Sequence, residues 1–318
     1  MKKLQSVTVL VPLYNEAAAL PQLFARLDRL FTSTTLQLDV LLVDDGSTDS
    51  TVADIKKFTA GNSNYSALFL SRNFGHAMAL TAGLKYIAER SDAVFIIDAD
   101  LQDPPELLPA FIKKLEEGND VVYGIRKGRK ESITKRICYK LFYRLQHRFS
   151  NVKMPLDAGD FSLLSQRVVL HMNALPEESR YLRGMRSWVG FSQAGIEYER
   201  AGRTDGDSKY PMKALLSLAF NGIFNFSEFP IRFISRLGIV SVLIALVYLA
   251  VTLYKKIVFG TVPEGFTALI FAIVLFSGVQ LLSLGIIGEY ILRIFFQVKQ
   301  RPLYIIKSKL IKGEVSDE

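Results

Sequence analysis

Two carboxylates two residues apart, Asp98 and Asp100, directly follow an apolar run at 93–97. The run has the length and β-branched content of a buried strand, and alternation along an extended chain directs both carboxylates to the same side. Like charges at the end of a buried strand are costly unless a cation neutralises them. Such oxygen ligands suit Mg²⁺ or Mn²⁺, which commonly bind with substrate phosphates. The pair predicts a metal-dependent enzyme for a phosphorylated substrate, although an isolated pair of this type also occurs in solvated loops.

The elements that would position this pair follow from the pattern of apolar residues. We expect strands at 7–11, 38–43, 67–70, 93–97 and 120–123, and helices at 17–31, 51–58, 76–89 and 107–117. Strands that alternate with helices indicate an α/β fold, with a parallel sheet covered by helices on both faces.

Polar clusters follow four of the expected strands. They are Tyr14-Asn15-Glu16, Asp44-Asp45-Gly46-Ser47, Arg72-Asn73 and Asp98-Ala99-Asp100. Ligands of parallel α/β sheets bind outside the carboxyl ends of the strands, so these clusters should meet at one rim. Neither G-x-G-x-x-G nor G-x-x-x-x-G-K-[ST] occurs, which disfavours dinucleotide and P-loop sites.

The composition narrows the classes of partner. The chain of 318 residues has a net charge of +8, and 49% of its residues are hydrophobic. A basic balance favours nucleic acid, an anionic membrane surface or phosphate-bearing ligands. The single cysteine, Cys138, excludes an internal disulfide, and three scattered histidines disfavour a zinc site. One of these, His76, begins an expected helix, and we expect its side chain only to satisfy a backbone group there.

Two uncharged apolar segments lie near the carboxyl end, at 237–254 and 266–288. Each approaches or exceeds the roughly 20 residues that a helix needs to cross a bilayer. Because their connector, 255–265, is too short for a domain, we expect a transmembrane hairpin rather than two buried helices of a soluble protein. Lysine and arginine are commoner on the outer flanks than at the tip, which favours cytoplasmic flanks. Membrane spans and the lack of a nucleic-acid motif exclude a nucleic-acid binder.

We therefore divide the chain into a soluble domain at 1–210, interfacial helices at 211–234, two transmembrane helices at 235–295 and a basic tail at 296–318. The interfacial segment is rich in apolar residues, and a buried core helix fits it nearly as well. The soluble domain and tail are expected on the cytoplasmic side of the inner (plasma) membrane. Small residues of the second span would permit close packing in a homo-oligomer: Ser277, Gly278, Ser283 and Gly285.

The segment 126–148 is strongly basic, with nine lysine or arginine residues and one acid, Glu131. Apolar residues recur every four positions from Ile133 to Phe149, as in an amphipathic helix. Such a helix beside a phosphate site favours docking on a membrane surface, though an ordinary helix with a solvated basic face has the same pattern. Side chains near its start are expected to bind the phosphate of a lipid acceptor: Arg126, Arg129, Lys130, Ser132 and Lys135.

Five motifs together resemble the polyisoprenyl-phosphate glycosyltransferases. They are VPLYNE at 11–16, VDDGSTDST at 43–51, RNFGHAMAL at 72–80, DADLQDPPE at 98–106 and GRTDGDSKY at 202–210. The resemblance implies a GT-A (Rossmann-like) fold, a nucleotide-sugar donor, a divalent metal and a lipid-phosphate acceptor. The predicted hairpin is more similar to bacterial undecaprenyl-phosphate (bactoprenol) glucosyltransferases than to single-domain dolichol-phosphate mannose synthases.

The resemblance also implies roles for individual residues. The donor would contact Pro12, Tyr14, Glu16, Asp44, Asp45 and Asp98, and Arg203 and Lys209 would close over its diphosphate from a loop that otherwise fits a plain linker. The metal would bind Asp98, Asp100 and Gln102, and the catalytic set would be Asp157, Asp100 and Arg126. Asp157 matches an acidic residue beside the transferred sugar. This chain has Gly159-Asp160-Phe161 where the mannose synthases usually have Ser-Gly-Phe, so the division of roles between Asp157 and Asp160 stays open.

The function expected from these features is an inverting, metal-dependent transfer of one hexose to a polyprenyl (undecaprenyl) phosphate at the cytoplasmic face. UDP-glucose is the donor that the resemblance implies. Two alternatives remain. A membrane polysaccharide synthase usually has more spans and a Gln-x-x-Arg-Trp pattern, which is absent around Trp188. A non-enzymatic lipid-binding protein with a degenerate transferase domain would not need the intact acidic pairs.

Overall fold

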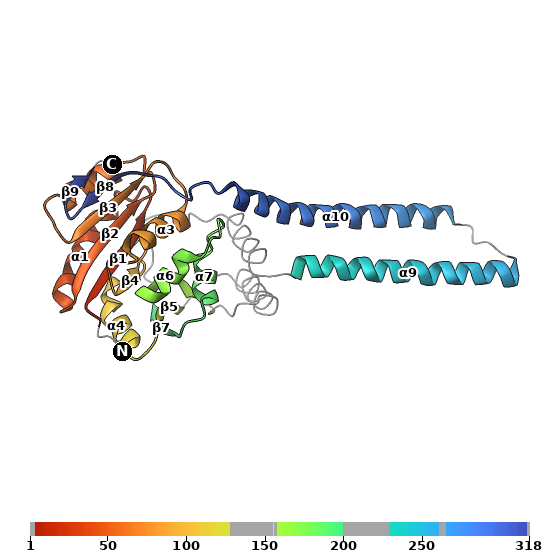
Figure 1. Ribbon diagram of the computed structural model, residues 1–318, viewed down its shortest axis with the longest axis horizontal. Coiled ribbons are helices and arrows are strands. Elements are labelled where there is room, and N and C mark those ends of the chain that lie inside the picture. Colours follow the sequence, from red (N-terminus) through yellow and green to blue (C-terminus); the bar gives the residue numbers. More distant parts are fainter. Residues whose placement is uncertain (1–3, 128–154, 156–157, 200–228, 261–264, 317–318) are drawn as a thin grey trace.

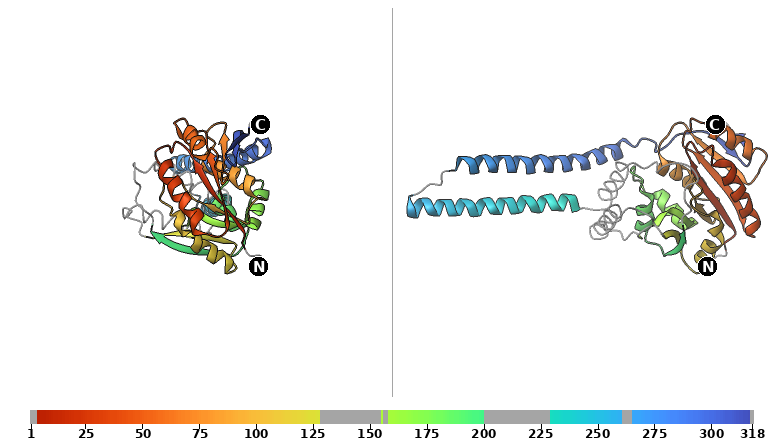
Figure 2. Two further views of the ribbon diagram at one scale, coloured as in Figure 1. Left: turned by 90° about the vertical axis from the view of Figure 1, so that its left-hand side faces the viewer. Right: turned by 180° about the vertical axis from the view of Figure 1, so that it is seen from behind.

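The computed structural model describes residues 4–127, 155, 158–199, 229–260 and 265–316. The described chain forms an α/β domain from which two long helices, α9 and α10, extend alongside each other (Figures 1 and 2). The predicted α/β class is therefore confirmed.

A nine-stranded sheet forms the centre of the described domain, in the order β7-β5-β6-β4-β1-β2-β3-β8-β9. Strands β4, β1, β2 and β3 are parallel, as predicted, whereas β6 runs antiparallel to both β4 and β5. The strands are β1 (Ser6–Leu13), β2 (Gln37–Asp44), β3 (Tyr65–Leu70), β4 (Ala93–Ile96), β5 (Val121–Lys127), β6 (Ala158–Ser165), β7 (Gln193–Glu199), β8 (Ile306–Ile311) and β9 (Glu314–Ser316).

Helices cover both faces of the sheet because apolar side chains recur at helical spacing. On one face α1 buries Leu20, Leu23 and Leu27 against the sheet, together with α2 and α4. On the other face α3, α6 and α7 contribute a second core that includes Leu80 and Met185. The helices are α1 (Leu20–Ser33), α2 (Thr51–Thr59), α3 (His76–Ile87), α4 (Leu108–Glu116), α6 (Gln166–Ala174), α7 (Leu182–Trp188), α9 (Phe229–Phe259) and α10 (Phe266–Lys299).

The residues after α10 return to the sheet as a β-hairpin. Strand β8 pairs antiparallel with β3, and β9 pairs with β8. Lys312 and Gly313 connect them with φ angles of 51° and 82°, the left-handed backbone that a two-residue hairpin turn requires. Leu310 is 2% exposed and packs in the core on the α1 face. The segment read from the sequence as a basic tail thus adds two strands to the sheet.

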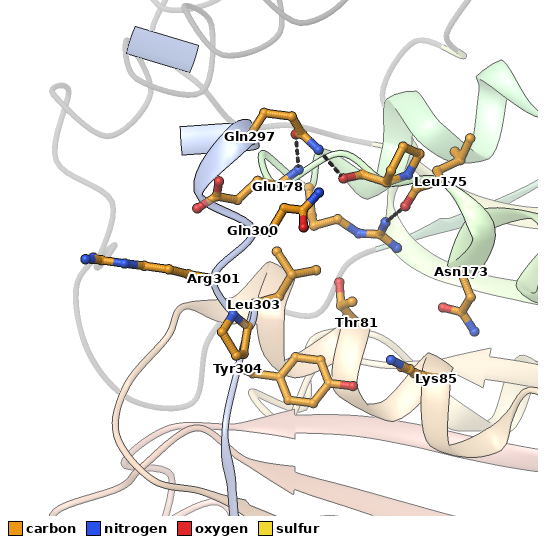
Figure 3. Close-up of a pocket in the computed structure, with 13 residues that line it drawn as sticks. Thr81, Lys85, Asn173, Leu175, Glu178, Gln297, Gln300, Arg301, Leu303 and Tyr304 are labelled. Atoms are coloured by element: carbon orange, nitrogen blue, oxygen red, sulfur yellow. Dashed lines mark hydrogen bonds between the residues drawn. The ribbon is translucent and has the colours of Figure 1, made fainter. Parts of the chain in front are cut away.

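The end of α10 also contacts the α/β domain. The Gln297 side chain donates from Nε2 to the Pro176 carbonyl oxygen at 2.6 Å, and its Oε1 accepts from the Glu178 amide at 2.9 Å (Figure 3). Beside this contact, a cavity of about 450 Å³ lies between α3, the segment after α6 and the residues that follow α10. Its lining includes Lys85, Arg180 and Tyr304, but none of the site residues predicted above.

Helices α9 and α10 have 31 and 34 residues, which at 1.5 Å per residue gives lengths of about 46 and 51 Å. By length and composition alone, Arg236–Phe259 and Leu275–Lys299 can each cross a membrane, and none of either segment is buried within the protein. The predicted hairpin of apolar helices agrees with this arrangement.

We expect Leu310→Ala to destabilise the α/β domain by about 2–4 kcal/mol, because the substitution leaves a cavity beneath β8. For a domain of this size the melting temperature should fall by about 5–10 °C, which thermal unfolding of the purified protein would measure. Ile311→Ala is the matched control, since this neighbour is 38% exposed and should cost about 0.5 kcal/mol or less. Equal shifts for the two variants would contradict the packing of β8 on the core.

Candidate active site

The predicted polar clusters meet at the carboxyl ends of the parallel strands. Leu13 at the end of β1 pairs with Asp44 at the end of β2, and β4 ends on the other side of β1. The 14–16 segment is hydrogen-bonded to the loop after β2. The Asn15 amide donates to Ser47 Oγ at 2.9 Å, and the Thr48 amide donates to Asn15 Oδ1 at 2.8 Å. Tyr14 is exposed beside this contact, so a ligand can reach the rim.

Asp44 and Asp45 are buried where β2 ends. Asp44 Oδ2 accepts from the Ser47 amide, and both oxygens of Asp45 accept amides of the segment before α3, from Phe74 and Gly75, each at 2.8 Å. Burial raises the pKa of both carboxyls, and the hydrogen bonds, which lower it, offset only part of the rise. Asp45 thus fixes the loop that leads into α3, and its predicted contact with the donor stays a prediction.

Asp98 and Asp100 follow β4 in a tight turn. The Gln102 amide donates to Asp100 Oδ1 at 3.2 Å, and Leu101 between them has a φ of 62°. A left-handed conformation is unusual for leucine and costs backbone energy, so the turn is held by its surroundings. It brings the three predicted metal ligands, Asp98, Asp100 and Gln102, into one short segment at the rim.

His76 and Asp160 lie beside Asp98. The Nε2 atom of His76 is 3.8 Å from Asp98 Oδ1 and 3.6 Å from Asp160 Oδ2. Asp160 also accepts two hydrogen bonds from Arg183, from Nε at 3.0 Å and Nη2 at 2.9 Å. Neither His76 nor Arg183 was expected here, since they reach the rim from α3 and α7. The sequence signal for His76 was its place in the RNFGHAMAL motif.

Charge balance in this group follows from burial and pairing. Burial raises the pKa of Asp98, and the neighbouring carboxylates Asp160 and Asp100 add to the rise while His76 opposes it. Burial also disfavours protonated His76, but Asp160 and Asp98 outweigh it and raise the His76 pKa to about 9. Arg183 and His76 overcome burial to hold the pKa of Asp160 well below its usual range. Asp98 and Asp160 therefore share His76, and Asp160 has Arg183 as a second cation.

The donor set fits a divalent cation. Mg²⁺ and Mn²⁺ are commonly held by one or two carboxylates, with waters and substrate phosphates completing the coordination. Asp98 and Asp100 supply such carboxylates, and a cation here would favour the charged form of Asp98, which burial and the neighbouring carboxylates disfavour. In the part of the chain that the structure describes, no three His, Cys, Asp or Glu side chains form a closed metal cluster.

Arg126, predicted to act in catalysis and bind the acceptor, lies near the end of β5 in a buried polar cluster. Its Nε donates to the Tyr198 hydroxyl at 3.2 Å, and its Nη2 is 4.0 Å from Asp103 Oδ1. Burial opposes its positive charge, but Asp103, Tyr198 and Asp98 outweigh it and raise the Arg126 pKa. Asp103 and Tyr198 were not identified from the sequence, although Asp103 belongs to the DADLQDPPE motif.

Of the remaining predicted residues, Pro12 is buried in β1 and Glu16 lies at the rim, where its amide donates to Thr51 Oγ1 at 3.0 Å. The others lie outside the described residues: Arg129, Lys130, Ser132, Lys135, Asp157, Arg203 and Lys209.

Comparison with known proteins decides the family. Residues 8–171 match the model of the glycosyl transferase family 2. The chain belongs to this family. It is 39% identical over 301 residues to YkcC of Bacillus subtilis, an uncharacterized glycosyltransferase, covering 94% of this chain and 93% of that protein. It is 36% identical over 304 residues to the bactoprenol glucosyl transferase of Shigella phage SfV, covering 95% and 98%.

A similar relation holds to the prophage bactoprenol glucosyl transferase homolog of Escherichia coli, at 35% identity over 302 residues, 95% of this chain and 98% of that protein. Among solved structures, glucosyl-3-phosphoglycerate synthase from Mycobacterium tuberculosis with Mn²⁺, UDP and glucosyl-3-phosphoglycerate has a TM-score of 0.48 at 17% identity, covering 69% and 77%. The predicted family resemblance is confirmed, and the protein is a glycosyltransferase of family 2 with an α/β domain.

We expect Asp45→Ala to loosen the start of α3 in this family 2 enzyme, because it leaves the amides of Phe74 and Gly75 without their acceptor. Loss of hydrogen bonds to a charged group costs about 1.5–3 kcal/mol, so amides 74–79 should exchange with deuterium at least about tenfold faster. Asp54→Ala is the control. Among the residues that the structure describes, the Asp54 carboxylate accepts one side-chain hydrogen bond, an exposed one from Ser50. Unchanged exchange at 74–79 would contradict the role of Asp45.

Proposed function

We propose that this glycosyltransferase transfers a single hexose, glucose from UDP-glucose, to a polyprenyl (undecaprenyl) phosphate at the cytoplasmic face of the inner membrane. The observation that carries the proposal is the placement of Asp98 and Asp100 in the turn after β4, at the carboxyl rim of the parallel strands, with Arg126 near the end of β5. The bactoprenol glucosyl transferases among its relatives support the choice of sugar and acceptor.

Asp98, Asp100 and Gln102 would hold Mg²⁺ or Mn²⁺. When bound, the cation supplies electrostatic stabilisation of the departing nucleoside diphosphate. Pro12, Tyr14, Glu16, Asp44 and Asp45 would surround the nucleoside, because the 14–16 segment and the loop after β2 form adjoining parts of the rim. Arg203 and Lys209 would contact the diphosphate.

The acceptor needs cations more than a general base, because a phosphate monoester is already an anion at neutral pH. Arg126 would bind it from the end of β5, together with Arg129, Lys130, Ser132 and Lys135. The sugar carbon gains positive character as the diphosphate leaves, and a nearby carboxylate would stabilise it. Asp157 is proposed for this task. Asp160 is held by Arg183 and His76, which favours a role in ordering Asp98 and its surroundings.

The membrane assignment rests on α9 and α10. Both expose apolar side chains along their length, including Leu243, Leu253 and Leu281, and burying these in lipid removes them from water. The excess of lysine and arginine on the outer flanks supports a cytoplasmic catalytic domain. The contact of Gln297 with the α/β domain would keep the rim at a fixed orientation to the spans.

Asp98→Asn and Asp100→Asn are each expected to lower transfer by at least about a thousandfold, because an amide cannot neutralise the cation that stabilises the leaving group. Membranes containing the protein would be assayed with labelled UDP-glucose, undecaprenyl phosphate and Mg²⁺. Asp54→Asn, on the outside of α2, should retain full activity.

The product of the same assay distinguishes the alternatives. A single lipid-linked sugar supports the proposed function, and a long polymer indicates a polysaccharide synthase. Full transfer by either acidic-pair variant would contradict the assigned role of the pair.

A further inference from the structure

A buried polar cluster of Asp103, Arg126 and Tyr198 joins three separate parts of the α/β domain. The Tyr198 hydroxyl donates to Asp103 Oδ1 at 2.6 Å and accepts from Arg126 Nε at 3.2 Å. The Asp103 side chain is fully buried, and that of Arg126 is 15% exposed. A charged pair this deep is costly to maintain unless its hydrogen bonds are satisfied, so its retention calls for an explanation.

The strand register places the three side chains together. Strands β5 and β7 are parallel, and Arg126 lies opposite Tyr198 near their carboxyl ends. Asp103 comes from the segment after β4, three residues beyond Asp100. The cluster therefore connects the segment that carries the acidic pair to the two strands at the other end of the sheet.

Two glycines leave room for this arrangement. A Cβ atom on Gly124 would lie 2.7 Å from Cε1 of the Tyr198 ring, and one on Gly159 would lie 2.9 Å from Arg126 Nη2. Real Cβ contacts are almost never so short. The lack of side chains at these positions of β5 and β6 lets the phenol ring and the guanidinium reach their observed places.

The hydroxyl of Tyr198 fixes the guanidinium of Arg126 in one plane. An arginine side chain has several rotatable bonds and loses much entropy when it is ordered, and a bond to Nε sets the direction of the two terminal nitrogens. Asp103 orders the hydroxyl in turn. The carboxylate lies 4.0 Å from Arg126 Nη2, long for a hydrogen bond, so it acts on Arg126 mainly through Tyr198 and through its charge.

We propose that Asp103 and Tyr198 are positioning residues that hold Arg126 at the rim for the phosphate monoester of the acceptor. The proposal rests on the proposed function. It gives the cluster a purpose beyond joining strands, because an ordered cation next to the Asp98 site can bind an attacking phosphate without first losing side-chain entropy.

The test is the KM of each substrate in Tyr198→Phe. This variant removes the hydroxyl and keeps the ring, which packs on Phe161 with centroids 5.1 Å apart. Loss of a hydrogen bond to a charged group corresponds to a change in affinity of about tenfold or more. We therefore expect the KM for undecaprenyl phosphate to rise by about tenfold or more. The KM for UDP-glucose should stay within about twofold of the wild-type value, since only acceptor binding is affected.

Tyr65→Phe provides a matched control. The Tyr65 hydroxyl is also bound to a carboxylate, Asp28, at 2.7 Å, but it lies between β3 and α1. Its loss should lower stability to a similar extent and leave both KM values unchanged. Asp103→Asn, which keeps the shape and removes the charge, should raise the acceptor KM in the same direction as Tyr198→Phe.

A double-mutant cycle separates positioning from general stabilisation. If Tyr198 acts through Arg126, Tyr198→Phe should change the acceptor KM little once Arg126→Lys is present, because lysine lacks the Nε donor. Additive effects in the cycle, an unchanged acceptor KM in Tyr198→Phe, or a rise confined to the donor KM would each overturn the proposal. Lack of transfer by the wild-type protein would instead overturn the proposed function.

Discussion

The structure depends on how negative charge is balanced at the carboxyl rim of the sheet. Asp98, Asp100 and Asp160 meet there, and burial makes their mutual repulsion costly. Arg183 and His76 compensate Asp160, whereas among the described residues Asp98 shares His76 with Asp160 and is influenced by Arg126. Under the proposed function, a divalent cation bound with a diphosphate would balance the remaining negative charge.

The surrounding elements serve to keep these charges in place. Asp45 holds the segment before α3 and thereby the start of the helix that carries His76. The Tyr198 hydroxyl accepts a hydrogen bond from Arg126 and so holds it near the end of β5. The hairpin after α10 extends the same sheet, and Gln297 near the end of α10 is hydrogen-bonded to the α/β domain. Under the proposed function, this contact would help to place the rim for a reaction between a water-soluble donor and a lipid.

Much of this fold could be predicted from local patterns, because β1 to β4 are apolar runs and α1 has regular helical spacing. The position of the polar rim could be predicted as well, since the carboxyl ends of parallel strands must lie together. The strands β8 and β9, which follow β3 in the sheet, were missed, because IKSKLI alternates weakly and only its pairing with β3 makes it a strand. His76, Arg183, Asp103 and Tyr198 were also missed. Asp103 and Tyr198 are 95 residues apart, and no local pattern encodes such a contact.

The most direct test of the charge balance is the binding of Mn²⁺ to the purified protein in the presence of UDP, followed by electron paramagnetic resonance. The wild-type protein should bind Mn²⁺ tightly only when UDP is present, and Asp98→Asn should weaken this binding by at least about tenfold, since Asp98 is one of the two carboxylates proposed to hold the cation. Equal Mn²⁺ binding by the wild-type protein and Asp98→Asn would contradict a cation held at this rim.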